Sequence, residues 1–93
     1  MTLLLKDPAA SLDYAVDWGA EYLTGDILSQ SNWEVIPVEI GGVSVVATSF
    51  DTTVANVTAT GGVGGHVYQL TNKVVLASGL TDSRSIVLRV EKR

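Results

Sequence analysis

The sequence predicts an all-β protein: an immunoglobulin-like or fibronectin-III-like antiparallel sandwich of two sheets and about seven strands. Short alternations of apolar and polar residues recur about every ten residues, separated by clusters of Gly, Asp, Ser and Thr. Helical periodicity is nearly absent, and 93 residues are close to the size of one such sandwich. We therefore expect a single immunoglobulin-like domain over residues 1–93, with a packed core and shallow surface grooves but no deep pocket.

The first expected strand is the short apolar segment Thr2–Lys6, which ends at Asp7 and Pro8. In the second, Ser11–Trp18, the residues Leu12, Tyr14, Val16 and Trp18 share one face, and Asp13, Ala15 and Asp17 share the other. This period of two predicts a half-buried strand that carries two aromatic rings into the core. Ala20–Leu23, bracketed by glycines, is long enough for one helical turn. The remaining expected strands are Ile27–Ile36, Val43–Phe50, Thr53–Thr60, Val67–Ala77 and Ser83–Lys92.

The last two strands are expected to form a hairpin through the turn Ser78–Asp82. Their inward residues should be Tyr68, Leu70, Val74 and Leu76, opposite Ile86, Leu88 and Val90. Tyr68 follows a Gly-rich corner near the start of the penultimate strand, which is the position of a tyrosine corner. In that motif the hydroxyl bonds back to the backbone of the corner; an ordinary core tyrosine is the alternative.

Composition excludes several classes of site. The chain has no cysteine, so it forms no disulfide and no thiolate metal site. Its net charge of −4 disfavours nucleic-acid binding, and no apolar run has the length of a secretion signal or a membrane span. Residues 1–51 hold eight acids and one base, whereas residues 52–93 hold two acids and five bases. This asymmetry reflects solvated strand faces, or it indicates a polar molecule that stacks head to tail or docks on a ring of charged neighbours.

The acidic residues Asp7, Asp13, Asp17 and Asp26 suggest a metal site, but their spacing argues against one. Asp13 and Asp17 would lie about 13 Å apart along one strand, too far to chelate a single cation. His66 has no Ser and Asp in a recognisable triad pattern, and an exposed or hydrogen-bonded corner histidine is the simpler interpretation. We expect no catalytic, cofactor-binding or metal-binding residues, no cofactor and no enzymatic activity.

Three further patterns have structural explanations. The run Gly61–Gly65 matches neither phosphate-binding motif and leads into a strand, so it predicts a corner. Asn56-Val57-Thr58 fits a glycosylation sequon but lies within an expected strand. Tyr14, Trp18 and Trp33 could stack on a sugar, yet Tyr14 and Trp18 share a core-facing side, which leaves Trp33 as the ring that could be exposed.

Three separated blocks resemble the phage fibre–tail adaptor family. The first is the K-D-P…L-D-Y-x-V-D-W run from Lys6 to Trp18, and the second is the S-x-W-x-V strand from Ser31 to Val35. The third runs from Thr60 through Tyr68–Asn72 and Ser78–Ser85 to a final L-x-V strand. Gly19–Leu23 departs from the family pattern, because a second tryptophan-containing turn would be expected there.

The resemblance implies a non-enzymatic structural component of a tailed phage or prophage virion, an adaptor that contacts other tail or fibre proteins. It implies a place in the virion tail after synthesis in the bacterial host cytoplasm, with homo-oligomers allowed and neither nucleic acid nor membrane as partner. The alternative is a bacterial immunoglobulin-like binding or adhesion module, with glycans as one class of ligand. Two hypotheses for assembly follow. In the first, Thr2–Lys6 pairs at a sheet edge, and deletion of residues 1–6 should leave a folded monomer that no longer assembles. In the second, the acidic half of one copy meets the basic half of a neighbour, and high salt should weaken this association.

Overall fold

The structure, a computed structural model, describes residues 2–20 and 25–92. Its seven strands each lie within two residues of the expected bounds. They are β1 (Thr2–Lys6), β2 (Leu12–Asp17), β3 (Leu28–Ile36), β4 (Ser44–Phe50), β5 (Val54–Thr60), β6 (Val67–Leu76) and β7 (Thr81–Val90). A short 3₁₀ helix, η1 (Trp18–Ala20), follows β2, while most of the helical turn expected at Ala20–Leu23 lies outside the described residues.

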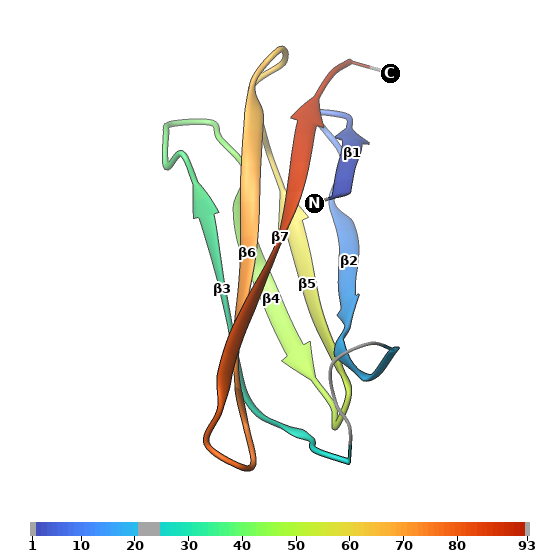
Figure 1. The fold of residues 1–93 in the computed structure, drawn as a ribbon. Helices are drawn as coiled ribbons and strands as arrows, with labels where there is room; N and C mark the ends of the chain where they lie inside the picture. The colour runs from blue at the N-terminus through green and yellow to red at the C-terminus, as the bar shows by residue number, and fades with distance from the viewer. Residues whose placement is uncertain (1, 21–24, 93) are drawn as a thin grey trace.

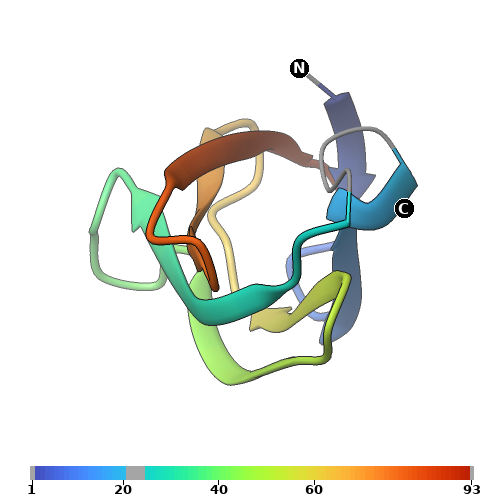
Figure 2. The same cartoon turned by 60° about the horizontal axis from the view of Figure 1, so that its bottom comes forward.

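The strands form two sheets, which confirms the predicted sandwich (Figure 1). One sheet has the order β1-β7-β6-β3 and the other the order β2-β5-β4. The second, fourth and fifth strands thus lie opposite the third, sixth and seventh, as in immunoglobulin-like sandwiches. Figure 2, which shows the molecule turned about the horizontal axis, makes it visible that the two sheets face each other. One pair departs from the expected antiparallel pattern: β1 runs parallel to β7.

The inward face of each sheet alternates as the sequence predicts. On β5 the fully buried residues are Ala55, Val57 and Ala59, and on β6 they are Tyr68, Leu70, Asn72 and Val74. Val16 and Trp18 are buried as expected, but Leu12 is 36% exposed. Leu12 is the first residue of β2, where the strand enters from the β1–β2 connection, so the other sheet covers it less completely.

A polar cluster crosses the core. Trp18 is fully buried, and its indole Nε1 donates a hydrogen bond of 2.8 Å to Oδ1 of Asn72. The Asn72 amide nitrogen donates in turn to Ser31 Oγ at 2.9 Å and to the Asn32 carbonyl at 3.1 Å. Asn72, although fully buried, therefore links β6 to β3 and to η1, which follows β2.

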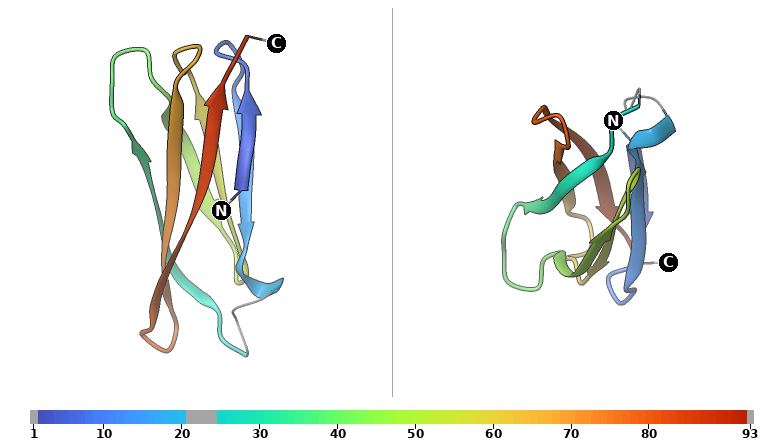
Figure 3. Two further views of the ribbon diagram at one scale, coloured as in Figure 1. Left: turned by 45° about the horizontal axis from the view of Figure 1, so that its top comes forward. Right: turned by 90° about the horizontal axis from the view of Figure 1, so that it is seen from below.

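The connections gather at two ends of the sandwich. The β3–β4 loop (residues 37–43) and the Gly-rich β5–β6 corner (residues 61–66) lie at one end, together with the end of β7 (Figure 3). The β6–β7 hairpin lies at the other end, closed by the Leu76 amide, which donates to the Leu80 carbonyl at 2.8 Å. Within the described residues, no helix has the length and apolar character needed to cross a membrane.

Candidate functional site

Tyr68 forms the tyrosine corner that the sequence predicts. Its ring is fully buried, and its hydroxyl oxygen accepts a hydrogen bond of 3.0 Å from the Val63 amide in the Gly-rich corner. The same hydroxyl donates to Oε1 of Glu39, a residue of the β3–β4 loop. Burial and the bond to Glu39 raise the pKa of Tyr68 above its usual value, so the phenol stays protonated and continues to donate.

Glu39 also accepts a hydrogen bond from His66. The His66 Nδ1 lies 2.8 Å from Glu39 Oε1, and the two side chains are 50% and 29% exposed. Hydrogen bonds from Tyr68 and then from His66 lower the pKa of Glu39, so the carboxylate is charged at neutral pH. His66 lies at the corner, as its position in the sequence predicts, whereas no sequence motif marks Glu39.

The Glu39 contacts fix the β3–β4 loop to the β5–β6 corner. The Glu39 carbonyl accepts from the Gly42 amide at 3.0 Å, and the Gly41 carbonyl accepts from the Gly62 amide at 3.0 Å. A Cβ on Gly42 would lie 2.7 Å from Glu39 Cγ, and Gly41 has a φ of +74°. These two positions require glycine, because a side chain would strain the turn or displace Glu39.

The residues on either side of Glu39 point into solvent. Val38 is 86% exposed and Ile40 is 101% exposed, so two β-branched apolar side chains protrude from a loop that Glu39 holds in place. Large apolar side chains presented in this way are typical of protein-interaction sites. We call Val38 and Ile40 the apolar prongs.

An apolar patch lies beside the apolar prongs, on the outer face of the four-stranded sheet. The register aligns Ile36 with Gln69 and Val87, and aligns Leu5 with Arg89 and Val67, so these side chains share that face. Leu5, Ile36 and Val67 are each about half exposed. Ile36, Pro37 and Val67 are among the residues around a shallow depression of about 370 Å³.

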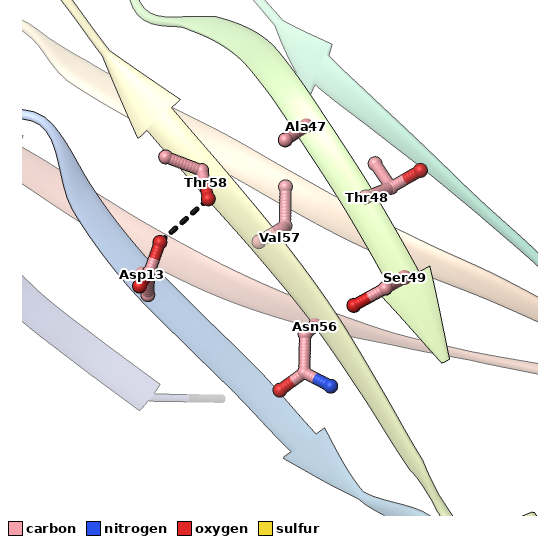
Figure 4. Close-up of a pocket in the computed structure, with 7 residues that line it drawn as sticks. All are labelled: Asp13, Ala47, Thr48, Ser49, Asn56, Val57 and Thr58. Atoms are coloured by element: carbon pink, nitrogen blue, oxygen red, sulfur yellow. Dashed lines mark hydrogen bonds between the residues drawn. The ribbon is translucent and has the colours of Figure 1, made fainter. Parts of the chain in front are cut away.

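A second depression, of about 350 Å³, lies on the outer face of the three-stranded sheet (Figure 4). Asp13, Thr48, Ser49, Asn56 and Thr58 supply its polar lining, and Thr58 Oγ1 donates to Asp13 Oδ1 at 2.5 Å. The described residues around it include no aromatic ring on which a sugar would stack. Asn56, the sequon asparagine, is within β5.

The other candidates from the sequence are not brought together. Among the described residues, no three His, Cys, Asp or Glu side chains converge as a metal site would require. Trp18 lies in the core, and Trp33, the ring that on sequence grounds could be exposed, is half-buried and packs against the core. The side chain of His66 is hydrogen-bonded to the carboxylate of Glu39. Among the described residues, no Ser or Thr hydroxyl is shown bonded to the His66 ring, as a catalytic nucleophile would be.

The charge asymmetry of the sequence is partly neutralised within the chain. Lys73 Nζ lies 3.2 Å from Glu34 Oε1, which pairs the basic half with the acidic half across β6 and β3. Arg89 Nε lies 2.7 Å from Glu91 Oε1, and Lys6 is fully buried. The Lys73–Glu34 pair thus joins the basic and acidic halves within one molecule, whereas the Arg89–Glu91 pair lies within the basic half.

Comparison with known families identifies the group to which this fold belongs. A family model described as podophage GP4 fiber-tail adaptor protein gp77 matches residues 6–89. The chain belongs to this adaptor family. The match begins at the last residue of β1 and covers β2–β6 and all but the last residue of β7, and it includes both the tyrosine corner and the loop that carries the apolar prongs. A search among curated proteins finds no match.

Membership in the fiber-tail adaptor family indicates a structural role in a phage tail, in contact with other tail or fibre proteins. This confirms the family and the class of protein that the sequence predicts. The adaptor's outer surface offers two distinct chemical faces: an apolar one at the end with the prongs, and a polar one over the three-stranded sheet.

The carboxylate of Glu39 should make loop stability depend on acid. A carboxylate with a lowered folded pKa stabilises the native state above its ordinary value of 4.5, and the contribution is lost as the pH falls through the folded pKa. In Glu39→Gln, the free energy of unfolding should therefore fall less steeply with acid than in the wild type. Urea unfolding at a series of pH values measures this slope.

Asp26 and Asp51 also have lowered pKa values, so some acid sensitivity should remain in the variant. Tyr68→Phe removes the main cause of the Glu39 shift and should flatten the same slope. Identical slopes in the wild type and both variants would show that Glu39 does not hold the loop through its charge.

Proposed function

We propose that this chain joins tail and fibre components of the virion by protein–protein contact, with the apolar prongs as the principal docking element. The observation that supports this is the near-complete exposure of Val38 and Ile40 on a loop whose backbone and central carboxylate are already bonded. The chain works in this way as a non-enzymatic structural part of the tail. Its single immunoglobulin-like domain serves as a rigid support for the loop.

Docking through the prongs is favoured by two physical effects. Burial of each β-branched side chain contributes about 1.5–3 kcal/mol relative to leaving it in water. The loop is held before binding by Glu39, so little additional ordering entropy opposes association. The neighbouring apolar patch of Leu5, Ile36 and Val67 extends the surface that a partner would cover.

The double variant Val38→Ser/Ile40→Ser should abolish binding to a partner without unfolding the chain. Both side chains are solvent-exposed, so the free energy of unfolding should change by no more than about 0.5 kcal/mol per site. Binding is measured by titration against the purified tail and fibre proteins of the same phage or prophage.

Leu80→Ser is the matched control, because Leu80 is 67% exposed in the β6–β7 hairpin at the opposite end of the molecule. It should bind as the wild type does. Equal binding by the prong variant and the control would exclude the prongs as the docking element. Absence of binding to every tail and fibre protein by the wild type would contradict the adaptor function itself.

The alternative, a bacterial adhesion or glycan-binding module, finds less support. Trp18 is buried and hydrogen-bonded, and Trp33 is half-buried against the core. The polar depression of Figure 4 offers hydroxyl, amide and carboxylate groups but no stacking platform in its described lining. Synthesis in the host cytoplasm and the absence of nucleic-acid and membrane partners remain predictions.

A further inference from the structure

Strand β4 forms one edge of the three-stranded sheet. In the described residues it pairs with β5 alone, and β3, which lies beyond it, belongs to the other sheet. Side chains on both faces of β4 are exposed, including Val46 at 58% and Phe50 at 43%. The strand is therefore at the margin of the sandwich, and its backbone groups on the side away from β5 are not used in either sheet ladder.

This edge lacks two of the usual protections against pairing with another chain, a charged side chain and a proline. Its sequence, Ser-Val-Val-Ala-Thr-Ser-Phe, contains no charge and no proline, and four of its seven residues are β-branched or aromatic. One irregularity, where the register shifts between Val45 and Ala47, interrupts the ladder next to Val46. Beyond that point the strand is regular as far as Phe50.

The hairpin between β4 and β5 shows which backbone groups face outward. The Asp51 amide donates to the Val54 carbonyl at 3.0 Å, so Asp51 faces β5. Hydrogen-bonding direction alternates along an antiparallel strand. Ser49 therefore also faces β5, and the N–H and C=O groups of Thr48 and Phe50 point toward the open edge.

We propose that a second copy of this chain pairs antiparallel with β4 across a two-fold axis at Thr48, giving one six-stranded sheet. Thr48 then exchanges hydrogen bonds with its own symmetry mate, and Val46 of each copy lies opposite Phe50 of the other. Aromatic and β-branched residues form favourable cross-strand pairs, and both side chains are exposed in the single chain.

The strand itself favours a second copy as the occupant. A two-fold contact requires a self-complementary surface, and β4 meets this requirement because it brings no charge against its own image. Pairing of this kind differs from the head-to-tail attraction between acidic and basic halves. It should therefore persist at high salt, where attraction between exposed charges is screened.

Sedimentation of the full chain over a range of concentrations tests the dimer. The wild type should shift from monomer to dimer at both low and high salt. Val46→Lys, which places a charge on the edge, should raise the midpoint concentration at least tenfold. Ser29→Lys adds the same charge at an exposed position of β3 and should leave the midpoint unchanged.

Cross-linking tests the register, since the chain contains no cysteine of its own. Thr48→Cys should form a covalent dimer with a short thiol-specific cross-linker. Ser44→Cys should not, because the two Ser44 positions would lie about 26 Å apart in this register. A wild type that stays monomeric at every concentration, a dimer that dissociates in salt, or equal cross-linking at both positions would overturn the proposal.

Discussion

Trp18→Ala should lower the free energy of unfolding by about 3–5 kcal/mol, the usual cost of replacing a fully buried Trp or Phe by alanine. Trp18 is completely buried, and the substitution would leave both a cavity between the sheets and an Asn72 amide without its donor. Because small domains have about 5–15 kcal/mol of stability, this variant should be close to unfolding. Urea unfolding followed by circular dichroism measures the loss.

Phenylalanine substitutions separate the hydrogen bond from the packing. Trp18→Phe should cost about 1–3 kcal/mol beyond the lost volume, since Oδ1 of Asn72 stays buried without a donor. Trp33→Phe is the matched control, because the buried Trp33 Nε1 has no hydrogen-bond partner among the described residues. Trp33→Phe should cost little, and equal losses in the two variants would show that the Trp18–Asn72 bond contributes nothing.

The strands and the core were predictable because their signal is local. Alternation places Tyr68, Leu70 and Val74 on one face of a strand whatever the remainder of the fold, and the structure buries all three. The tyrosine corner was predictable for the same reason, since Val63 and Tyr68 are five residues apart in the chain.

The site was not predictable because its partners are distant in sequence. Glu39 is 27 residues from His66 and 29 from Tyr68, and only the crossover between the two sheets brings them together. In the sequence Asn72 is an isolated polar residue on an otherwise apolar strand face, yet it is hydrogen-bonded to Trp18, which lies 54 positions away in the chain. Neither contact leaves a spacing or a composition that sequence reasoning can detect.

The periodicity of the sequence likewise could not predict that β1 pairs in parallel with β7. Alternation identifies Thr2–Lys6 as a strand but carries no information on its direction or its neighbour. The structure pairs β1 with β7 within the chain and buries Lys6, so deletion of residues 1–6 would remove part of the core as well as an edge. That the deletion leaves a folded monomer which no longer assembles stays a prediction, and a substitution at Lys6 tests separately how β1 is held.

Lys6→Ala should lower the free energy of unfolding by about 2–4 kcal/mol, from lost packing and lost hydrogen bonds. The fully buried ammonium group donates to the Gly61 carbonyl at 2.6 Å and to the Asp7 carbonyl at 3.0 Å, which ties β1 to the Gly-rich corner. Burial lowers the pKa of Lys6, and Asp7 partly opposes this effect. Because burial of the charged ammonium group costs desolvation free energy, much of the stability that Lys6 contributes comes from packing of its hydrocarbon stem.

Lys6→Met keeps most of that stem and removes the ammonium group, so its stability should fall between those of the wild type and Lys6→Ala. Urea unfolding gives the global loss, and hydrogen exchange at the β1 and β7 amides shows whether β1 detaches locally first. In both variants exchange should accelerate along β1 more than along β5, which lies in the other sheet. Stability within about 0.5 kcal/mol of the wild type for Lys6→Ala, or equal protection of β1 in all three proteins, would show that Lys6 does not fasten the strand.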